Sequence, residues 1–360
     1  MRLFIPGPVS VSNNIVQAMD KEMIGHRGKE FAEIFGECSS GLKKVFQTNN
    51  RVLISTSSGT GLMEAAIRNC VNSDVLMVEC GAFGKKWVDI AKACGKNVDV
   101  LHVEAGKAVT YEELEKKLSE KKYEAVCVTH NETSTGVANN LADLTPLIKE
   151  HGALYCVDTV SSMGGANVAV DEIGIDVCLT SSQKCFSLPP GLSFASVSER
   201  ALEKSKTVKG KGYYFDFVEL AKEYDTNQTP YTPAVGLIFG LREQLKGMLT
   251  EGMDNVWARH VAFATETQNW ATSHGLGLFA QEGNRSVTVT CVENTKKANL
   301  EDVKKKVKAR GYVMDAGYRK LNDNLIAAGK NETLRIPHMG NLTMAELKAY
   351  LDCLTEEMKL

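Results

Sequence analysis

Short apolar runs alternate with amphipathic stretches through the first half of the chain. The apolar runs are rich in valine, isoleucine and leucine, as is typical of buried strands. They span residues 52–55, 75–78, 98–103, 125–129 and 154–157, and the stretches with helical spacing between them span residues 62–67, 87–94, 111–119 and 144–150. Strands that alternate with helices predict βαβ units and an α/β fold, with a mainly parallel sheet covered by helices on both faces.

The pattern changes in the second half, where helices predominate. Residues 235–248 and 257–274 predict two helices, the second leading into another domain. Strands at 287–292 and 333–336, a helix at 300–310, and a final helix whose apolar face carries Leu347, Leu351, Leu354 and Met358 follow. We therefore expect a large domain over residues 16–255, a small α+β domain over residues 256–360, and an N-terminal segment, residues 1–15, that joins the small domain to the site.

Composition limits the classes of function. The 360 residues are 43% apolar and 24% charged with a net charge of −2, so nothing indicates binding to nucleic acid or to an anionic membrane. No apolar run is long enough to span a membrane, and no signal peptide precedes the first strand, so we expect a cytoplasmic protein. The ten cysteines lack CxxC spacing, which favours buried free thiols over disulfides or a metal site.

Lys184 lies in a polar turn between two apolar runs, residues 175–180 and 192–197, and Asp158 follows the run at 154–157. A lysine held among neutral groups can lose its proton and form a Schiff base with an aldehyde, and a buried carboxylate can keep a pyridine nitrogen protonated. Pyridoxal phosphate chemistry requires both. Taken alone, the two residues fit a surface lysine and a helix-capping aspartate equally well.

Polar loops follow several of the expected strands. They comprise residues 56–61, 81–84 and 130–136, together with Asp158 and Lys184. In open α/β sheets, ligands bind at the carboxyl ends of the strands. The convergence of these loops at one edge therefore indicates a binding site more strongly than any single motif does.

Each loop offers a different chemical group. Residues 57–61 precede a helix and can present backbone N–H groups to a phosphate, without the spacing of a nucleotide-binding P-loop. Phe83 can stack on a flat cofactor or pack in the core, and residues 130–136 can bind a phenolic oxygen or form a capping turn. Arg335 lies in a short apolar strand, where it needs an anionic partner: a ligand carboxylate, or an aspartate or glutamate of the chain.

The motifs together resemble the class V aminotransferases, in particular the alanine–glyoxylate, serine–glyoxylate and serine–pyruvate group. They extend over nearly the whole chain: PGP at 6–8, SGTG at 58–61, GAFG at 81–84, HNETSTG at 130–136, DTVSS at 158–162, SQK at 182–184, PPG at 189–191 and LRI at 334–336. The resemblance implies the fold type I architecture of pyridoxal phosphate enzymes and a homodimer with its active sites at the subunit interface.

The same resemblance assigns roles around the cofactor. It implies that pyridoxal phosphate forms a Schiff base with Lys184, that Asp158 pairs with the pyridine nitrogen, and that Val160 and Phe83 lie on the two faces of the ring. The remaining contacts that it implies are Gly59, Thr60 and Gln183 on the phosphate and Thr133 on the ring oxygen.

The resemblance also addresses the substrate and the second subunit. Arg335 would bind the substrate α-carboxylate, and a threonine of the neighbouring subunit, either Thr229 or Thr232, would reach the phosphate; we place it at Thr232. The implied reaction transfers an amino group from alanine or serine to glyoxylate or pyruvate, with Lys184 as general base and acid.

Three alternatives remain open at this point. Cys185 and the loop at residues 130–133 are also reminiscent of 2-aminoethylphosphonate–pyruvate transaminases, whose substrate lacks an α-carboxylate. A cysteine desulfurase needs a reactive cysteine on a flexible loop, whereas Cys291 and Cys353 lie in strand-like and helix-like stretches. A cofactor-free binding protein is the third alternative, and the presence of both Lys184 and Asp158 argues against it.

Overall fold

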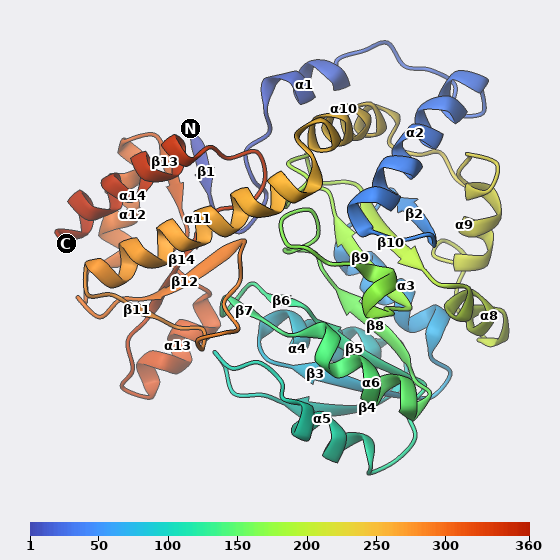
Figure 1. The fold of residues 1–360 in the computed structure, drawn as a ribbon, viewed down its shortest axis with the longest axis horizontal. Coiled ribbons are helices and arrows are strands. Elements are labelled where there is room, and N and C mark those ends of the chain that lie inside the picture. The colour runs from blue at the N-terminus through green and yellow to red at the C-terminus, as the bar shows by residue number, and fades with distance from the viewer.

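The computed structural model describes residues 1–360 and is built around a seven-stranded sheet (Figure 1). In spatial order the strands are β2 (Arg51–Ser55), β10 (Ser193–Val197), β9 (Val177–Ser181), β8 (Leu154–Asp158), β5 (Ala125–Thr129), β3 (Asp74–Glu79) and β4 (Asn97–His102). The strands from β9 to β4 run parallel, and β10 is antiparallel to both β9 and β2. The predicted α/β fold with a mainly parallel sheet is confirmed.

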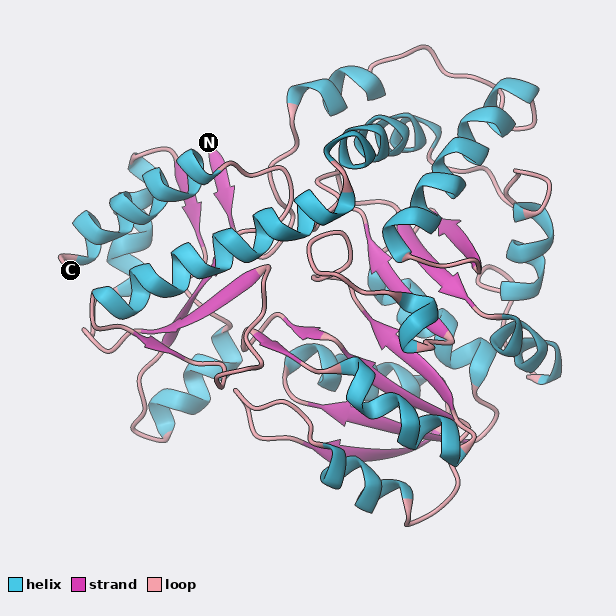
Figure 2. Cartoon of the chain, in the orientation of Figure 1, coloured by secondary structure: helices cyan, strands magenta, loops and turns pink.

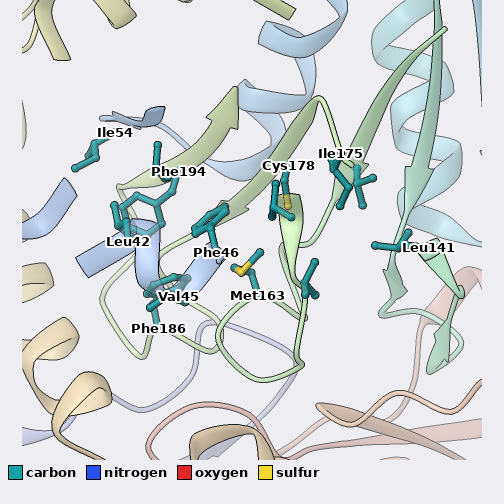
Figure 3. Close-up of a cluster of buried hydrophobic side chains, with 14 of the residues drawn as sticks. Leu42, Val45, Phe46, Ile54, Leu141, Met163, Ile175, Cys178, Phe186 and Phe194 are labelled. Atoms are coloured by element: carbon teal, nitrogen blue, oxygen red, sulfur yellow. The ribbon is translucent and has the colours of Figure 1, made fainter. Parts of the chain in front are cut away.

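Successive side chains of the central strands enter two different cores, because side chains alternate between the faces of a sheet. In β8, Tyr155 and Val157 belong to one apolar cluster, and Leu154 and Cys156 belong to the other. Figure 3 shows part of the first cluster, where Phe46 lies among side chains from the sheet and its flanking loops. Both faces are buried, which explains why the strands read as continuous apolar runs rather than as alternating ones.

Helices cover both faces of this sheet (Figure 2). One cluster takes in α2 (Lys29–Phe46), α5 (Tyr111–Leu118), α6 (Leu141–His151) and α10 (Val235–Glu251), and the other takes in α3 (Gly59–Cys70), α4 (Ala82–Ala93), α8 (Glu199–Thr207) and α9 (Phe217–Tyr224). The remaining elements of this part are α1 (Asn13–Met19), α7 (Val170–Ile173), and the short strands β6 (Asn131–Glu132) and β7 (Val137–Ala138). The sequence pattern did not predict α8 and α9.

The long helix α11 (Met253–Ser273) leads from the large sheet to a second, smaller unit (Figure 1). Its antiparallel sheet contains β11 (Gly277–Leu278), β12 (Val289–Glu293) and β14 (Thr333–Pro337). The helices α12 (Leu300–Ala309), α13 (Arg319–Ala327) and α14 (Met344–Met358) complete it, and the apolar face predicted for the last helix is buried.

The N-terminal segment contains a strand that the sequence pattern did not predict. This strand, β1 (Arg2–Phe4), pairs in parallel with β13 (Tyr312–Met314) of the smaller unit. Phe4 stacks on Tyr350 of α14 with ring centroids 3.8 Å apart. The first helix begins only at Asn13, after Pro6 and Pro8, which disfavour a helix at the start of the chain. The chain therefore starts in the smaller unit and then crosses to the large sheet.

All ten cysteines are free thiols, and nine of them are buried. No helix combines the length and the apolar character that crossing a membrane would require.

Candidate active site

The functional side chains come from loops at the carboxyl ends of the parallel strands. Asp158 is the last residue of β8, and Lys184 follows β9 after two residues of loop. Phe83 follows β3 and Thr133 follows β5, while Gly59 begins α3 after the edge strand β2. The parallel strands end at one edge of the sheet, so the predicted convergence of these loops is present.

Lys184 is buried against the N-terminal segment. It is 9% exposed, and its Nζ donates a hydrogen bond to the carbonyl of Pro6. Burial is the main cause that lowers its pKa to about 8, and the positive charge of Arg335 acts in the same direction. In a fraction of the protein molecules Lys184 is therefore uncharged near neutral pH, as a nucleophile or base requires.

Gly7 shapes the space around this lysine. Its φ of +119° lies in a region that other residues rarely adopt, and a Cβ built there would lie 2.6 Å from Lys184 Nζ. The Pro6–Gly7–Pro8 segment therefore forms one wall of the space around Lys184.

Asp158 has a buried carboxylate, one oxygen of which receives no hydrogen bond from the chain. It is 3% exposed, its Oδ1 accepts a hydrogen bond of 2.8 Å from the Val160 N–H, and its Oδ2 has no partner in the chain. Burial raises its pKa to about 7, and the charge of Glu132 adds to this effect. Such a carboxylate gains most from a buried cationic partner, and a protonated pyridine nitrogen has that character.

The start of α3 forms a cradle, in which Gly59 lacks a side chain. A Cβ at Gly59 would lie 2.6 Å from Val160 Cγ2 and 3.5 Å from Ser181 Oγ, and the Ser181 hydroxyl is buried without a partner. The first N–H groups of a helix have no acceptor within the helix, so those of Gly59 and Thr60 can bind an anion. The cradle, the unpartnered hydroxyl and the open carboxylate together fit pyridoxal phosphate.

Phe83 is held in place by a residue that sequence reasoning did not single out. Glu132 is fully buried and accepts hydrogen bonds from the N–H groups of Phe83 at 2.9 Å and Gly84 at 3.1 Å. Its other oxygen accepts from the backbone and the hydroxyl of Ser134. Burial raises the pKa of Glu132, and these four donors oppose the shift. Loop 130–136 thus caps α4 and fixes the backbone of Phe83.

Arg335 already has a carboxylate partner within the chain. Its Nε and Nη2 each donate a hydrogen bond of 2.9 Å to Asp315, and its Nη1 donates to the carbonyl of Thr133 at 3.1 Å. Of the two partners that the sequence allowed, the structure shows the intramolecular one. The Thr133 hydroxyl donates to Ser161 Oγ at 2.8 Å. The bond from Arg335 to the Thr133 carbonyl joins the smaller unit to the loop after β5.

The remaining predicted residues are Gln183, next to Lys184 in the chain, and Thr229 and Thr232, in a turn before α10. Gln183 is half-buried beside Lys184, and its carbonyl accepts from the Val9 N–H at 3.1 Å. Thr229 is buried and donates to the Tyr231 carbonyl, whereas Thr232 is exposed. Their turn packs on the loop after β2, where the Ala234 N–H donates to Thr56 Oγ1. The hydrogen bonds of this turn do not connect it to Lys184.

The model of the family Aminotransferase class-V matches residues 11–349. An uncharacterised aminotransferase of Methanocaldococcus jannaschii is 38% identical over 99% of this chain and 92% of its own. The serine–glyoxylate aminotransferase of Hyphomicrobium methylovorum is 38% identical over 78% of this chain and 72% of its own. The crystal structure of an alanine–glyoxylate aminotransferase from Nostoc sp. superposes with a TM-score of 0.91 at 29% identity, covering 99% of this chain and 94% of that one.

These similarities extend over the whole fold as well as over the motifs of the site. The chain therefore belongs to the class V aminotransferases, pyridoxal-phosphate-dependent enzymes of fold type I, and is related to the serine– and alanine–glyoxylate aminotransferases.

Proposed function

We propose that this enzyme transfers the amino group of alanine or serine to a small 2-oxo acid, glyoxylate or pyruvate. The observation that carries the proposal is the placement of Lys184, whose pKa is lowered to about 8, and of the buried carboxylate of Asp158 at the ends of the adjacent strands β9 and β8. Similarity to a serine–glyoxylate and an alanine–glyoxylate aminotransferase supports this choice of substrates.

The residues of the site would hold pyridoxal phosphate in the following way. Asp158 would bind the pyridine nitrogen, and Val160 and Phe83 would lie on the two faces of the ring. The backbone of Gly59 and Thr60 and the side chain of Gln183 would bind the phosphate, and Thr133 would reach the ring oxygen. When bound, the cofactor supplies an electron sink that makes the Cα proton of the substrate acidic.

Lys184 would move that proton. With its Nζ uncharged, Lys184 would accept the proton from the substrate Cα and later return it as a general acid. The wall formed by Pro6 and Gly7 keeps the lysine close to the reacting atoms. Arg335 would bind the α-carboxylate through the N–H groups that Asp315 and Thr133 leave free, and so direct the Cα–H bond toward Lys184.

The active unit would be a homodimer. The exposed Thr232, or its neighbour Thr229, would reach the phosphate bound to the partner, as in the relatives that the motifs resemble. Residues 16–255 would form the cofactor-binding domain and residues 256–360 the small domain, with residues 1–15 joining the small domain to the site.

The test is an absorption spectrum of the protein with pyridoxal phosphate, recorded before and after separate additions of L-alanine, L-serine, L-aspartate and 2-aminoethylphosphonate. We expect alanine or serine to remove the visible band and glyoxylate or pyruvate to restore it. Conversion by 2-aminoethylphosphonate alone would favour the phosphonate transaminase alternative, because that donor has no α-carboxylate for Arg335.

A lysine variant tests the catalytic assignment. Lys184→Ala is expected to lose the amino transfer, whereas Lys211→Ala, at a lysine paired with Asp216 away from the site, is expected to retain it. Full activity and an unchanged spectrum in Lys184→Ala would refute the proposal.

A further inference from the structure

We propose that Asp315 is a positioning residue that fixes Arg335 and weakens its attraction for the α-carboxylate of the substrate. The inference rests on the proposed function, in which Arg335 binds that carboxylate. It concerns a residue directly after β13 that no sequence motif indicated.

The pair is bidentate and largely buried. The Asp315 carboxylate receives two hydrogen bonds of 2.9 Å from Nε and Nη2 of Arg335, and the two side chains are only 16% and 9% exposed. Asp315 is itself held, because its Oδ1 also accepts from the Gly317 N–H at 2.9 Å. The backbones of Asp315 and Arg335 form an isolated β-bridge. The carboxylate is therefore a fixed part of the binding site.

A count of donors shows where a substrate can bind. A guanidinium group has five N–H donors, and the chain uses three of them: two for Asp315 and one for the Thr133 carbonyl. One N–H remains on each of the terminal nitrogens Nη1 and Nη2. A second carboxylate can bind to these two, since carboxylates pair with guanidinium through two parallel hydrogen bonds.

The orientation of Arg335 does not depend on Asp315 alone. The Thr133 carbonyl holds Nη1, and the guanidinium carbon lies 5.7 Å from the centre of the Tyr318 ring, within the range of a cation–π contact. Removing the charge of Asp315 while keeping an acceptor therefore leaves Arg335 close to its present position. The main consequence is electrostatic.

Two electrostatic effects of Asp315 oppose substrate binding. Its charge repels a second carboxylate, and two carboxylates on adjacent edges of one guanidinium lie about 7 Å apart. At an effective dielectric constant of about 20 to 40, this repulsion raises the dissociation constant of the substrate roughly ten- to fifty-fold. Asp315 also satisfies the buried charge of Arg335 before the substrate arrives, which lowers the gain from a new anionic partner.

The experiment compares two probes in Asp315→Asn and in the unchanged enzyme, both loaded with pyridoxal phosphate. The probe 2-aminoisobutyrate carries an α-carboxylate but no Cα proton, so it binds without amino transfer, and tert-butylamine has a methyl group in place of the carboxylate and also lacks a Cα proton. Asparagine can still accept hydrogen bonds from Arg335 Nε and Gly317. We expect the dissociation constant of 2-aminoisobutyrate to fall about tenfold and that of tert-butylamine to stay unchanged.

A matched control is Asp225→Asn. Asp225, at the end of α9, forms the same bidentate pair with Arg51, the first residue of β2, at 2.7 and 2.8 Å. The substitution Asp225→Asn should leave the dissociation constants of both probes unchanged. In thermal unfolding, 2-aminoisobutyrate should raise the melting temperature of Asp315→Asn more than that of the unchanged enzyme. A purely structural role of Asp315 would lower stability without this dependence on the probe.

An unchanged or higher dissociation constant of 2-aminoisobutyrate in Asp315→Asn would overturn the inference. If that variant does not fold, Asp315→Ser removes the same charge and gives the same test. The proposed function fails in a different way: the unchanged enzyme would then bind 2-aminoisobutyrate no more tightly than tert-butylamine, or convert no amino acid at all.

Discussion

Replacing Asp158 by asparagine should change how the stability of the cofactor-free protein depends on pH. Asparagine preserves the shape of the side chain and the acceptor for the Val160 N–H, but it cannot ionise. Asp158 has a folded-state pKa raised to about 7 from an ordinary value of 3.8, chiefly by burial. The folded protein therefore binds more protons than the unfolded chain between these two values. The stabilising contribution is fully present below pH 3.8 and is lost as the pH rises through about 7.

The size of the effect follows from linkage. At pH 8 the group is ionised in both states, and at pH 5 it is mostly protonated only in the folded state. The interval from pH 5 to the folded pKa covers about two units, and each unit corresponds to about 1.4 kcal/mol. The unchanged protein should therefore gain about 3 kcal/mol from this residue on going from pH 8 to pH 5, and Asp158→Asn should gain nothing from it.

Urea unfolding of the two cofactor-free proteins at pH 5 and pH 8 measures this difference. Titrating groups that do not interact with Asp158 cancel when the two proteins are compared, including the buried His130, His260 and His338, whose pKa values are lowered to about 4, 4 and 3. Lys184 and Glu132 interact with Asp158, so the measured difference includes their response to its replacement. Asp225→Asn serves as a control, because the pKa of Asp225 is lowered by its bond to Arg51 and the group does not titrate in this range. Equal pH dependence in Asp158→Asn and the unchanged protein would refute the assignment of a raised pKa.

Two further substitutions test the walls of the site. Glu132→Ala removes the buried acceptor of the Phe83, Gly84 and Ser134 N–H groups. It should lower the free energy of unfolding, measured with urea, by about 3 kcal/mol. A decrease below about 1 kcal/mol would mean that these N–H groups find other acceptors. Gly7→Ala places a methyl group 2.6 Å from Lys184 Nζ at a φ of +119°, and should lower the rate of amino transfer at least about tenfold in a folded protein. Unchanged turnover in Gly7→Ala would show that the N-terminal segment does not constrain the lysine.

The large sheet could be predicted because its signal is local. Apart from the edge strand β4, whose residues are only partly buried or exposed, the strands are buried, so each appears in the sequence as a short run of apolar residues that needs no knowledge of its neighbours. The rule that ligands bind at the carboxyl ends of parallel strands then placed Asp158 and Lys184 together before any contact was known. The helices α8 and α9 were missed because they are short and only one face of each is apolar.

The partners of the site residues could not be predicted in the same way. Glu132 was visible only as one polar residue in a polar loop, and its role depends on where α4 begins, which the apolar pattern placed several residues too late. For Arg335 the sequence required an anion without identifying it. Asp315 lies 20 residues earlier, after a short strand whose pairing is not encoded in its own pattern.

The pairing of β13 with β1 accounts for two contacts of the site. The parallel pair of β1 and β13 ends at Phe4 and Met314, and the chain continues from these residues to Pro6 on one side and to Asp315 on the other. Pro6 accepts the hydrogen bond of Lys184, and Asp315 holds Arg335. The stacking of Phe4 on Tyr350 fixes the pair against α14. A three-residue strand at the start of the chain, with no chemistry of its own, thus sets the distance between the proposed base and the proposed carboxylate-binding group.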